Sequence, residues 1–352
     1  MQREQCCGTR FPFMKILFCS VLYSPSVGGI ETVSATLAGE FHRAGHSVTL
    51  VTQSPSAAPD DEAYLVVRRP GWRQLWRMVR ESDVVFHNNI SLRLGWPLVI
   101  LRRPWVVAHH TWIPHQGVAA RLKRRLLRFA SNVSVSHAVA RDLPVRSTVL
   151  PNPYRSSLFR PIAGVARTKD VVFLGRLVCD KGAGMLLDAL HLLQSRGLVL
   201  RATLIGEGPE EADLKAQSER LGLSPQVEFV GSQTGERLVR LLHEHQVLVV
   251  PSVWEEPFGL VVLEAIACGC IPLVAQSGGL PDAAGPCGRV FAKGNVLALA
   301  DGMQTLYLER EGLDSLRKPE REHLSRHLPE RVAVDYLRVL SDACRGNSPI
   351  PV

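Results

Sequence analysis

Two glutamates that could act on a bound ligand, Glu256 and Glu264, are separated by seven residues in an otherwise apolar part of the chain. The uninterrupted apolar run at residues 247–250 predicts a strand that is buried on both faces of a parallel sheet. Pro257 and Gly259 predict a turn from that strand into a helix. Open α/β sheets bind ligands at the carboxyl ends of their strands, and Glu264 would lie within about two helical turns of Glu256. Both carboxylates can therefore face one ligand.

The free backbone N–H groups at the start of this predicted helix favour the oxygens of a phosphate group at the same place. Taken singly, Glu256 is equally well explained as a solvated loop acid, and Glu264 as an acid on a helix surface. As a pair beside Pro-Phe-Gly and an apolar helix, they are harder to explain by folding alone, because alanine or leucine would serve that purpose.

Two cations flank a glycine-bearing turn earlier in the chain. Arg176 follows the strand predicted at residues 170–174, and Lys181 precedes a helix predicted to end at Leu193. Two cations beside a helix N-terminus suit a diphosphate. Either side chain is also explained as an ordinary surface charge.

Two further turns are candidates for contact with a ligand. Gly28-Gly29 follows the strand predicted at residues 15–22 and would let the backbone approach a ligand closely, although a plain tight turn explains the pair equally well. The spacing is not Gly-x-Gly-x-x-Gly, so no nicotinamide site is indicated. His110 stands just past the carboxyl end of another predicted strand. A single histidine is usually structural, but the neighbouring His109 favours a ligand contact.

The length and charge of the chain limit the function classes. At 352 residues it is longer than one hydrophobic core usually serves, so two domains are expected. A hydrophobic content of 46% and a charged content of 21% are typical of a globular protein. The net charge of +8 is uneven: residues 1–150 contain 19 Lys and Arg against 9 Asp and Glu, and the remainder contains 22 against 24. This asymmetry indicates an anionic partner for the first half.

The basic residues of the first half lie mainly in two segments that are predicted to be amphipathic helices. The second segment is residues 121–128, and the first contains Arg68, Arg69, Arg73, Arg77 and Arg80 with Trp72 and Trp76. Solvated helix faces explain these segments as well as an anionic membrane surface does. Nucleic acid is not expected as a partner, because no recognised binding motif accompanies the charge.

The eight cysteines show no Cys-x-x-Cys pair and no zinc-like spacing, so they are expected to be thiols in a reducing compartment. No apolar stretch reaches the roughly 18 residues of a membrane-spanning helix. Residues 3–23 superficially imitate a secretion signal, but a glycine turn and a helix follow at once, so a first strand is the better interpretation. Met14 is a second candidate for the start of the chain. These features predict a cytoplasmic protein, either free or peripheral on the inner face of the membrane.

Alternating strands and helices predict an α/β fold in two parts. The first domain is expected at residues 14–160 and the second at 168–328, with a linker at 155–168 that is rich in Arg, Pro, Gly and Ala. Short strands are also expected at residues 134–139 and 201–205. The last helix, at 329–345, has one apolar face and is expected to pack against another element.

Six motifs occur in an order that resembles the retaining glycosyltransferases of family 4. They are Gly28-Gly29-Ile30-Glu31, His110-Thr111, Gly175-Arg176 with Lys181-Gly182, Gly206-Glu207-Gly208-Pro209, Glu256 with Glu264, and Gly278-Gly279. The resemblance spans nearly the whole chain, and the block Pro-Ser-x-x-Glu-Glu-Pro-Phe-Gly-x-x-x-x-Glu-Ala is its most specific part. It implies two Rossmann-like domains that face each other across a cleft, the GT-B type of fold, with the last helix crossing back onto the first domain.

The resemblance also implies a role for each motif. Arg176 and Lys181 would neutralise the diphosphate of a nucleotide-sugar. Glu264 would hold the ribose of this donor, and Glu256 would contact the hydroxyls of the transferred sugar. His110 would contact the sugar near the reacting carbon, so the expected catalytic residues are Glu256, His110, Arg176 and Lys181. The other residues expected to bind the donor are Gly28, Gly29, Gly206, Pro257, Phe258, Gly259, Leu260 and Val261.

The sequence therefore predicts transfer of a sugar, with retention, from a nucleotide-sugar to a glycan, a lipid-linked or a small-molecule acceptor. No cofactor and no metal are expected, because the sequence lacks Asp-x-Asp and because fixed cations and N–H dipoles can stabilise a leaving diphosphate. A nucleotide-sugar epimerase or hydrolase of the same architecture is one alternative, and a non-catalytic nucleotide-binding module is another.

Two features depart from the family pattern. The usual Asn-Gly-Val-Asp after the first domain is here Asn152-Pro153-Tyr154-Arg155, which predicts a different geometry where the domains are joined. The first domain is also short, so reduced acceptor loops are expected.

Overall fold

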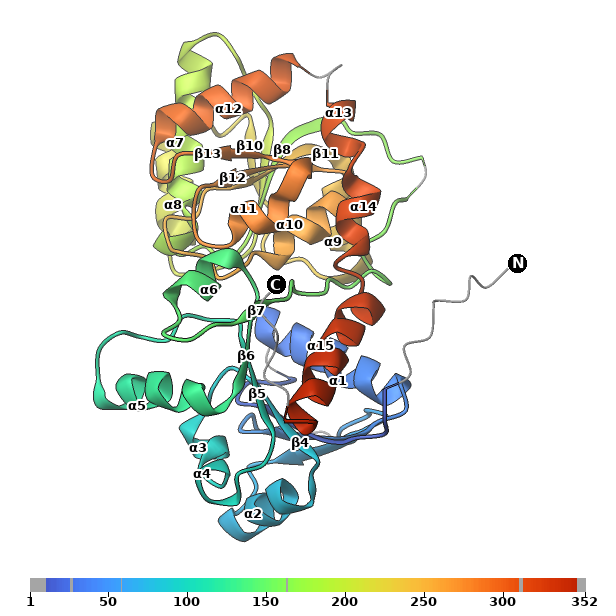
Figure 1. Cartoon of the computed structure of the whole chain (residues 1–352). Helices are drawn as coiled ribbons and strands as arrows, with labels where there is room; N and C mark the ends of the chain where they lie inside the picture. Colours follow the sequence, from blue (N-terminus) through green and yellow to red (C-terminus); the bar gives the residue numbers. More distant parts are fainter. Residues whose placement is uncertain (1–10, 26–27, 58, 163, 310–312, 347–352) are drawn as a thin grey trace. The chain divides into compact units, whose positions relative to one another are not determined.

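A computed structural model describes residues 11–25, 28–57, 59–162, 164–309 and 313–346, which form two α/β units (Figure 1). The first unit extends through Val135, continues over Val139–Leu150 and includes the C-terminal segment from Pro329. The second unit consists of Ser136–Ala138 and Pro151–Leu328. Each unit contains one parallel sheet covered by helices, as the alternating pattern predicts.

The sheet of the first unit has seven parallel strands in the order β3-β2-β1-β4-β5-β6-β7. They are β1 (Lys15–Ser20), β2 (Ser47–Thr52), β3 (Leu65–Arg68), β4 (Val84–Asn88), β5 (Trp105–His109), β6 (Ser131–Ser134) and β7 (Thr148–Val149). The order reverses between β1 and β4, so the carboxyl ends of these two strands form a topological switch point.

The helices of this part of the chain connect or cover the strands. They are α1 (Gly29–Arg43), α2 (Trp72–Glu81), α3 (Leu92–Gly95), α4 (Leu98–Leu101), α5 (Val118–Leu126), the 3₁₀ helix Leu127–Phe129, α6 (His137–Asp142) and α15 (Pro329–Cys344).

Side chains of the first sheet alternate between two faces, because successive residues of a strand point to opposite sides. On one face, Leu17 of β1 and Leu75 of α2 belong to the same buried cluster. On the other face, the ring of Phe18 meets that of Phe86 edge-on, with 4.7 Å between centroids, and Phe86 meets Tyr336 of α15 at 5.5 Å. The last helix thus packs against α1, β4 and β5 within the first unit (Figure 1).

The sheet of the second unit has six parallel strands in the order β10-β9-β8-β11-β12-β13. They are β8 (Lys169–Leu174), β9 (Ala202–Ile205), β10 (Val227–Phe229), β11 (His245–Val250), β12 (Ile271–Ala275) and β13 (Arg289–Phe291). Counted within the unit, this is the Rossmann order 3-2-1-4-5-6, and its switch point lies between β8 and β11.

Helices cover both faces of the second sheet, which is why β12 and residues 247–250 of β11 can be apolar. The helices are α7 (Ala183–Ser195), α8 (Glu211–Arg220), α9 (Gly235–Glu244), α10 (Leu260–Ala267), α11 (Leu280–Ala284), α12 (Val296–Leu308), α13 (Asp314–Arg317), α14 (Glu320–Ser325) and the 3₁₀ helices Cys179–Lys181 and Gly285–Cys287. α7 packs against α12, while α10 packs against α11 and α14 (Figure 1).

The strand predicted at residues 134–139 is wrong. β6 ends at Ser134, and α6 begins at His137. The N–H of His137 donates to Oδ2 of Asp282 at 2.7 Å. An acidic side chain thus satisfies one of the free N–H groups at the start of a helix, and this partner from a distant part of the sequence favours the helix over the strand.

The basic helix predicted from Arg68 onward begins later than expected. Arg68 is the last residue of β3, where it pairs with Thr52 of β2, and its Nε donates to Asp60 at 3.1 Å. Pro70 and Gly71 follow, and α2 starts at Trp72. The placement of Arg68 and Arg69 in the helix is therefore wrong, because pairing with β2 keeps Arg68 extended.

Residues 151–160 belong to the second unit, whereas the sequence places them in the first domain. The N–H of Tyr154 donates to the carbonyl of His327 at 3.2 Å, and Nδ1 of His327 lies 2.9 Å from the carbonyl oxygen of Asn152. These bonds tie the segment to the chain just before α15. The sequence could not indicate them, because the partners are far apart along the chain.

Among the residues that the structure describes, no helix combines the length and the apolar character needed to cross a membrane.

Candidate active site

The loops that leave β8 and β11 meet at the switch point of the second unit. The N–H groups of Val253 and Trp254 donate to the carbonyl of Asp180 at 3.0 and 3.2 Å. Two loops at the carboxyl edge of the sheet are thereby joined through their backbones. This is the edge at which open α/β sheets bind ligands.

Lys181 and Glu256 form an ion pair between these two loops. The carboxylate also accepts a hydrogen bond from the hydroxyl of Ser252 at 3.0 Å. Glu256 is largely buried, with 12% of its side chain exposed, whereas 32% of the Lys181 side chain is exposed. The structure thus brings together one cation and one acid that the sequence singles out, and leaves the cation within reach of solvent.

The turn after Glu256 is held by hydrogen bonds from neighbouring loops. The N–H of Gly279 donates to the carbonyl of Glu256 at 2.7 Å, and the Ser136 hydroxyl donates to the carbonyl of Pro257 at 2.7 Å. The ring of Phe258 is buried and packs against His327, with 5.8 Å between centroids. What Phe258 can offer a ligand is therefore its backbone.

Glu255 clamps the same turn from its other side. Its carboxylate accepts a hydrogen bond from the N–H of Gly278 at 2.6 Å and forms an ion pair with Lys293. This acid is thus committed to holding two loops together. Glu255 is not among the residues predicted from the sequence, although it stands next to Glu256.

Glu264 lies on α10, which starts directly after Gly259 as predicted. Its carboxylate is mostly buried, and Oε1 lies 3.8 Å from Nη2 of Arg155. Burial raises the pKa of Glu264 to about 7, while the charge of Arg155 lowers it. Leu260 and Val261, also predicted to bind the donor, form the first turn of the same helix.

Arg176 and Gly206 lie on the loops that leave β8 and β9. The N–H of Gly175 donates to the carbonyl of Ile205 at 3.0 Å, and a Cβ on Gly206 would overlap the carbonyl oxygen of Gly175. The glycine therefore permits two loops to approach each other. The side chain of Arg176 is exposed and pairs with neither predicted carboxylate in the part of the chain that the structure describes.

The predicted residues of the first unit lie at the carboxyl edge of its own sheet. His110 follows β5 and is buried, and its N–H donates to Oδ1 of Asn89 at 2.7 Å. Asn89 follows β4, one of the two switch-point strands. Gly28 is the N-cap residue of α1, and Gly29 is the first residue of this helix.

Three residues of the site were not predicted from the sequence: Arg155, Ser252 and Lys293. Ser252 belongs to the Pro-Ser of the most specific block, so the motif carried a signal for it. Arg155 appeared only as a departure from a family pattern. Lys293 had no local signal, because its partner Glu255 comes from another loop.

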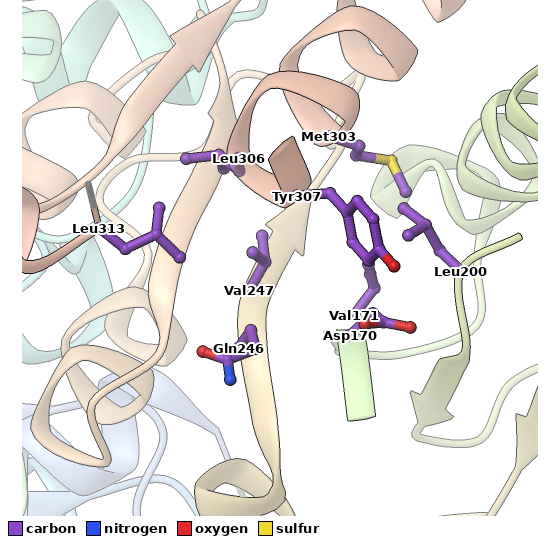
Figure 2. A pocket seen from close by; sticks show the side chains of 9 residues that line it. All are labelled: Asp170, Val171, Leu200, Gln246, Val247, Met303, Leu306, Tyr307 and Leu313. Carbon is purple, nitrogen blue, oxygen red and sulfur yellow. The ribbon is translucent and has the colours of Figure 1, made fainter. Parts of the chain in front are cut away.

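A small cavity of the second unit lies elsewhere (Figure 2). Its volume is about 10 Å³, enough for one water molecule at most, and Tyr307 and Met303 line it together with Asp170 and Gln246. Asp170 and Gln246 stand near the starts of β8 and β11, the edge opposite to the Lys181–Glu256 pair. The cavity is therefore too small and at the wrong edge to hold a nucleotide-sugar.

Within the described parts of the chain, no group of three or more His, Cys, Asp or Glu residues is arranged to hold a metal ion.

The chain has two Rossmann-type sheets, and a cation and an acid stand at the switch point of the second one. These features are typical of nucleotide-binding α/β proteins. Family comparisons narrow this class. The model described as "Glycosyl transferases group 1" matches residues 158–323, and the model described as "Glycosyltransferase Family 4" matches residues 27–153. The two matches together cover most of the chain, which belongs to the family 4, group 1 glycosyltransferases and has the GT-B type of fold.

Named relatives agree with this assignment. The gpi3 subunit of phosphatidylinositol N-acetylglucosaminyltransferase from Schizosaccharomyces pombe is 28% identical over 344 residues, which cover 86% of this chain and 75% of the relative. The GDP-mannose:cellobiosyl-diphosphopolyprenol alpha-mannosyltransferase from Xanthomonas oryzae is 26% identical over 377 residues, which cover 94% of this chain and 97% of the relative.

Solved structures show the same fold. HepE from Anabaena, crystallised in complex with UDP, superimposes with a TM-score of 0.79 and 21% identity, covering 94% of this chain and all of that one. WaaG, a glycosyltransferase involved in lipopolysaccharide biosynthesis, gives a TM-score of 0.68 at 18% identity and covers 90% of this chain and 98% of its own.

Proposed function

We propose that this glycosyltransferase binds the diphosphate and sugar of its donor at the Lys181–Glu256 pair of the second unit and transfers the sugar with retention to a lipid-linked acceptor. The observation that carries the proposal is the pair itself, formed between two loops at the switch point. An ammonium group suits a phosphate oxygen, and a carboxylate can accept hydrogen bonds from sugar hydroxyls.

The positive charge of Lys181 favours cleavage of the bond between the sugar and the diphosphate of the donor. As the bond between the anomeric carbon and the phosphate oxygen breaks, the leaving nucleoside diphosphate gains negative charge. A fixed ammonium group such as that of Lys181, together with the N-terminus of α7, then stabilises the transition state more than the ground state. The acceptor hydroxyl oxygen forms the new bond to the anomeric carbon, and its proton is taken up by the leaving nucleoside diphosphate.

Two kinds of comparison support the choice of substrates. HepE was crystallised with UDP and with UDP-glucose, which supports a nucleotide-sugar donor. The names of the yeast and Xanthomonas relatives include phosphatidylinositol and a diphosphopolyprenol, which supports a lipid-linked acceptor.

The test begins with binding, because it requires no acceptor. We expect one of UDP, GDP or ADP to raise the melting temperature of the wild-type chain, since a ligand that binds only the folded state stabilises it. Lys181→Ala should abolish this shift, because it removes the cation that pairs with the diphosphate. The matched control is Lys215→Ala, whose lysine pairs with Glu211 on the surface of α8 and should keep the shift.

Turnover is then measured as release of nucleoside diphosphate from the matching nucleotide-sugar in the presence of polyprenyl-diphosphate-linked glycans. Glu256→Ala and Lys181→Ala should each lower kcat/KM by about a hundredfold or more, and the thermal melts of both variants without ligand should stay close to the wild type. Full activity in either variant would refute the site. Sugar that is epimerised, or released only to water, would instead favour an epimerase or hydrolase.

Exposed side chains of α2 and α4 support the proposed peripheral position on an anionic membrane. Trp72 at the start of α2 is 65% exposed, and the guanidinium of Arg73 lies 4.9 Å from the centre of its ring. α2 contacts α4, on which Val99 and Ile100 are also exposed. Basic side chains next to exposed apolar ones suit the boundary between lipid head groups and acyl chains.

A further inference from the structure

The segment that departs from the family pattern contributes a side chain to the proposed donor site. Asn152 and Tyr154 are bound to His327, as described above, so the backbone of this segment is fixed within the second unit. Arg155 follows directly, and its carbonyl accepts hydrogen bonds from Leu158 and Phe159 at 3.0 and 2.9 Å. Arg155 is therefore presented by an ordered turn.

The guanidinium of Arg155 lies beside both an aromatic ring and a carboxylate. Its central carbon is 5.3 Å from the centre of the Phe159 ring, and Nη2 is 3.8 Å from Oε1 of Glu264. Phe159 is itself buried, so it provides a fixed surface for the guanidinium. This arrangement limits the positions open to a long side chain and holds its charge next to Glu264.

Arg155 is the one cation within ion-pair distance of the Glu264 carboxylate among residues with described positions. Other titratable or charged groups stand next to α10 and on the elements that pack against it. They are Asp282 on α11, Glu320, Arg321, Glu322 and His323 on α14, His245 on β11, Cys268 directly after α10, and Arg167, which donates to the carbonyl of Cys268. Burial lowers the pKa of both histidines, which disfavours their charged forms.

Glu264 needs such a cation because burial disfavours its charged form. Burial raises its pKa to about 7, in spite of the lowering by Arg155. A protonated carboxyl group offers fewer acceptor sites to two neighbouring hydroxyls than a carboxylate does. Without Arg155 the pKa would rise further, and less of Glu264 would be charged near pH 7.

We propose that Arg155 is a positioning residue for donor binding, which keeps the Glu264 carboxylate charged and oriented to accept hydrogen bonds from the ribose hydroxyls of the donor. This inference rests on the proposed function, in which Glu264 holds the ribose. Arg155 acts through Glu264. An aspartate, the residue that the family pattern has at this position, would oppose the charge on Glu264, so the arrangement is a property of this chain.

The test compares wild type, Arg155→Gln and Arg155→Lys by isothermal titration calorimetry between about pH 6 and pH 9. The probes are the nucleoside diphosphate that stabilises the wild type and its 2′-deoxy form. We expect Arg155→Gln to weaken binding of the ribonucleotide about tenfold near neutral pH and to recover towards pH 9, because a shift of one pKa unit changes the charged fraction up to tenfold. Arg155→Lys should restore the wild-type profile. The affinity for the 2′-deoxy form should depend less on pH in each variant.

Two results would overturn the inference. In the first, Arg155→Gln binds the ribonucleotide as tightly as the wild type at every pH. In the second, the substitution weakens binding of both nucleotides equally at every pH, as expected of a merely structural role or of a direct contact with the diphosphate. Melting curves without nucleotide check that each variant is folded. A failure of the proposed function would look different, because no nucleoside diphosphate would then bind the wild type and Lys181→Ala would change nothing; this result overturns both.

Discussion

Three glutamates near the switch point of the second unit each have their own ion-pair partner. Glu256 is bound by Ser252 and Lys181, Glu255 by a backbone N–H and Lys293, and Glu264 by Arg155. Each buried or half-buried acid thus has a cation next to it, which offsets the cost of removing its charge from water. Lys181 can exchange its partner for a phosphate, because its side chain is partly exposed and it stands just before the N-terminus of α7.

His110 is buried directly after β5, at the carboxyl edge of the first sheet. If it contacts the sugar near the reacting carbon, His110→Ala should lower kcat by about tenfold to a thousandfold, while affinity for the nucleoside diphosphate changes less than about twofold. Rapid-quench turnover and calorimetry measure the two quantities. His115→Ala is the matched control, since His115 is exposed and pairs with Asp142. A large loss of diphosphate affinity with unchanged kcat would contradict the role.

The residues that the sequence identified best are those whose neighbours along the chain carry the signal. Lys181 and Glu256 stand in turns that follow apolar strands, so strand and turn patterns were enough to place them at one sheet edge. Arg155 could not be assigned in this way, because its role depends on contacts with Glu264 and Phe159 that form only in the folded chain. The ribose and sugar contacts expected of Glu264 and Glu256 stay predictions.

At the scale of elements, the loops of the second unit pack on one another through glycines. Gly278 has φ +51°, and a Cβ there would overlap the carbonyl oxygen of Glu256. Gly206, after β9, is predicted to bind the donor, and Gly278, after β12, belongs to a motif of the resemblance; in the structure both glycines let two loops come close together. The rigid support of Glu256 comes from these contacts.

Gly278→Ala tests this packing. The left-handed conformation costs a non-glycine residue about 1–2 kcal/mol, and displacing the Glu256 carbonyl should add about 1–3 kcal/mol. We expect a lower free energy of unfolding and weaker binding of nucleoside diphosphate. Gly197→Ala is the control, because Gly197 also has positive φ, at +81°, but no atom within 4 Å of a Cβ. Chemical denaturation and calorimetry should separate the two; equal losses in both variants would mean that crowding at Gly278 is unimportant.

Helices and strands could be predicted where the sequence pattern is local. Their boundaries could not be predicted where a residue far away in the sequence determines them. The strand and helix around Glu256 and Glu264 follow from an apolar run, a proline and a glycine, and their positions agree with the structure. α6 could not be predicted, because Asp282 caps it from another part of the chain. The same holds for residues 151–160, which His327 retains in the second unit.

The net charge differs between the two halves of the sequence. Residues 1–150 carry an excess of ten positive charges, whereas the rest of the chain has an excess of two negative ones. A donor site in the second unit does not explain a basic first half. Arg73 and Arg77, both exposed on α2, are among the charges that a membrane contact would use.

Replacing Arg73 and Arg77 of α2 tests that contact. Each well-placed basic residue contributes about 1 kcal/mol to binding an anionic surface, so Arg73→Glu/Arg77→Glu should weaken binding to phosphatidylserine-containing vesicles about thirtyfold or more. The control is Arg237→Glu/Arg240→Glu, which reverses two exposed charges on α9 of the second unit and should bind as the wild type does. Added salt should weaken wild-type binding, because the Debye length falls to about 3 Å near 1 M. Vesicle binding that resists both salt and the α2 variant would show that basic charge does not hold this chain at a membrane.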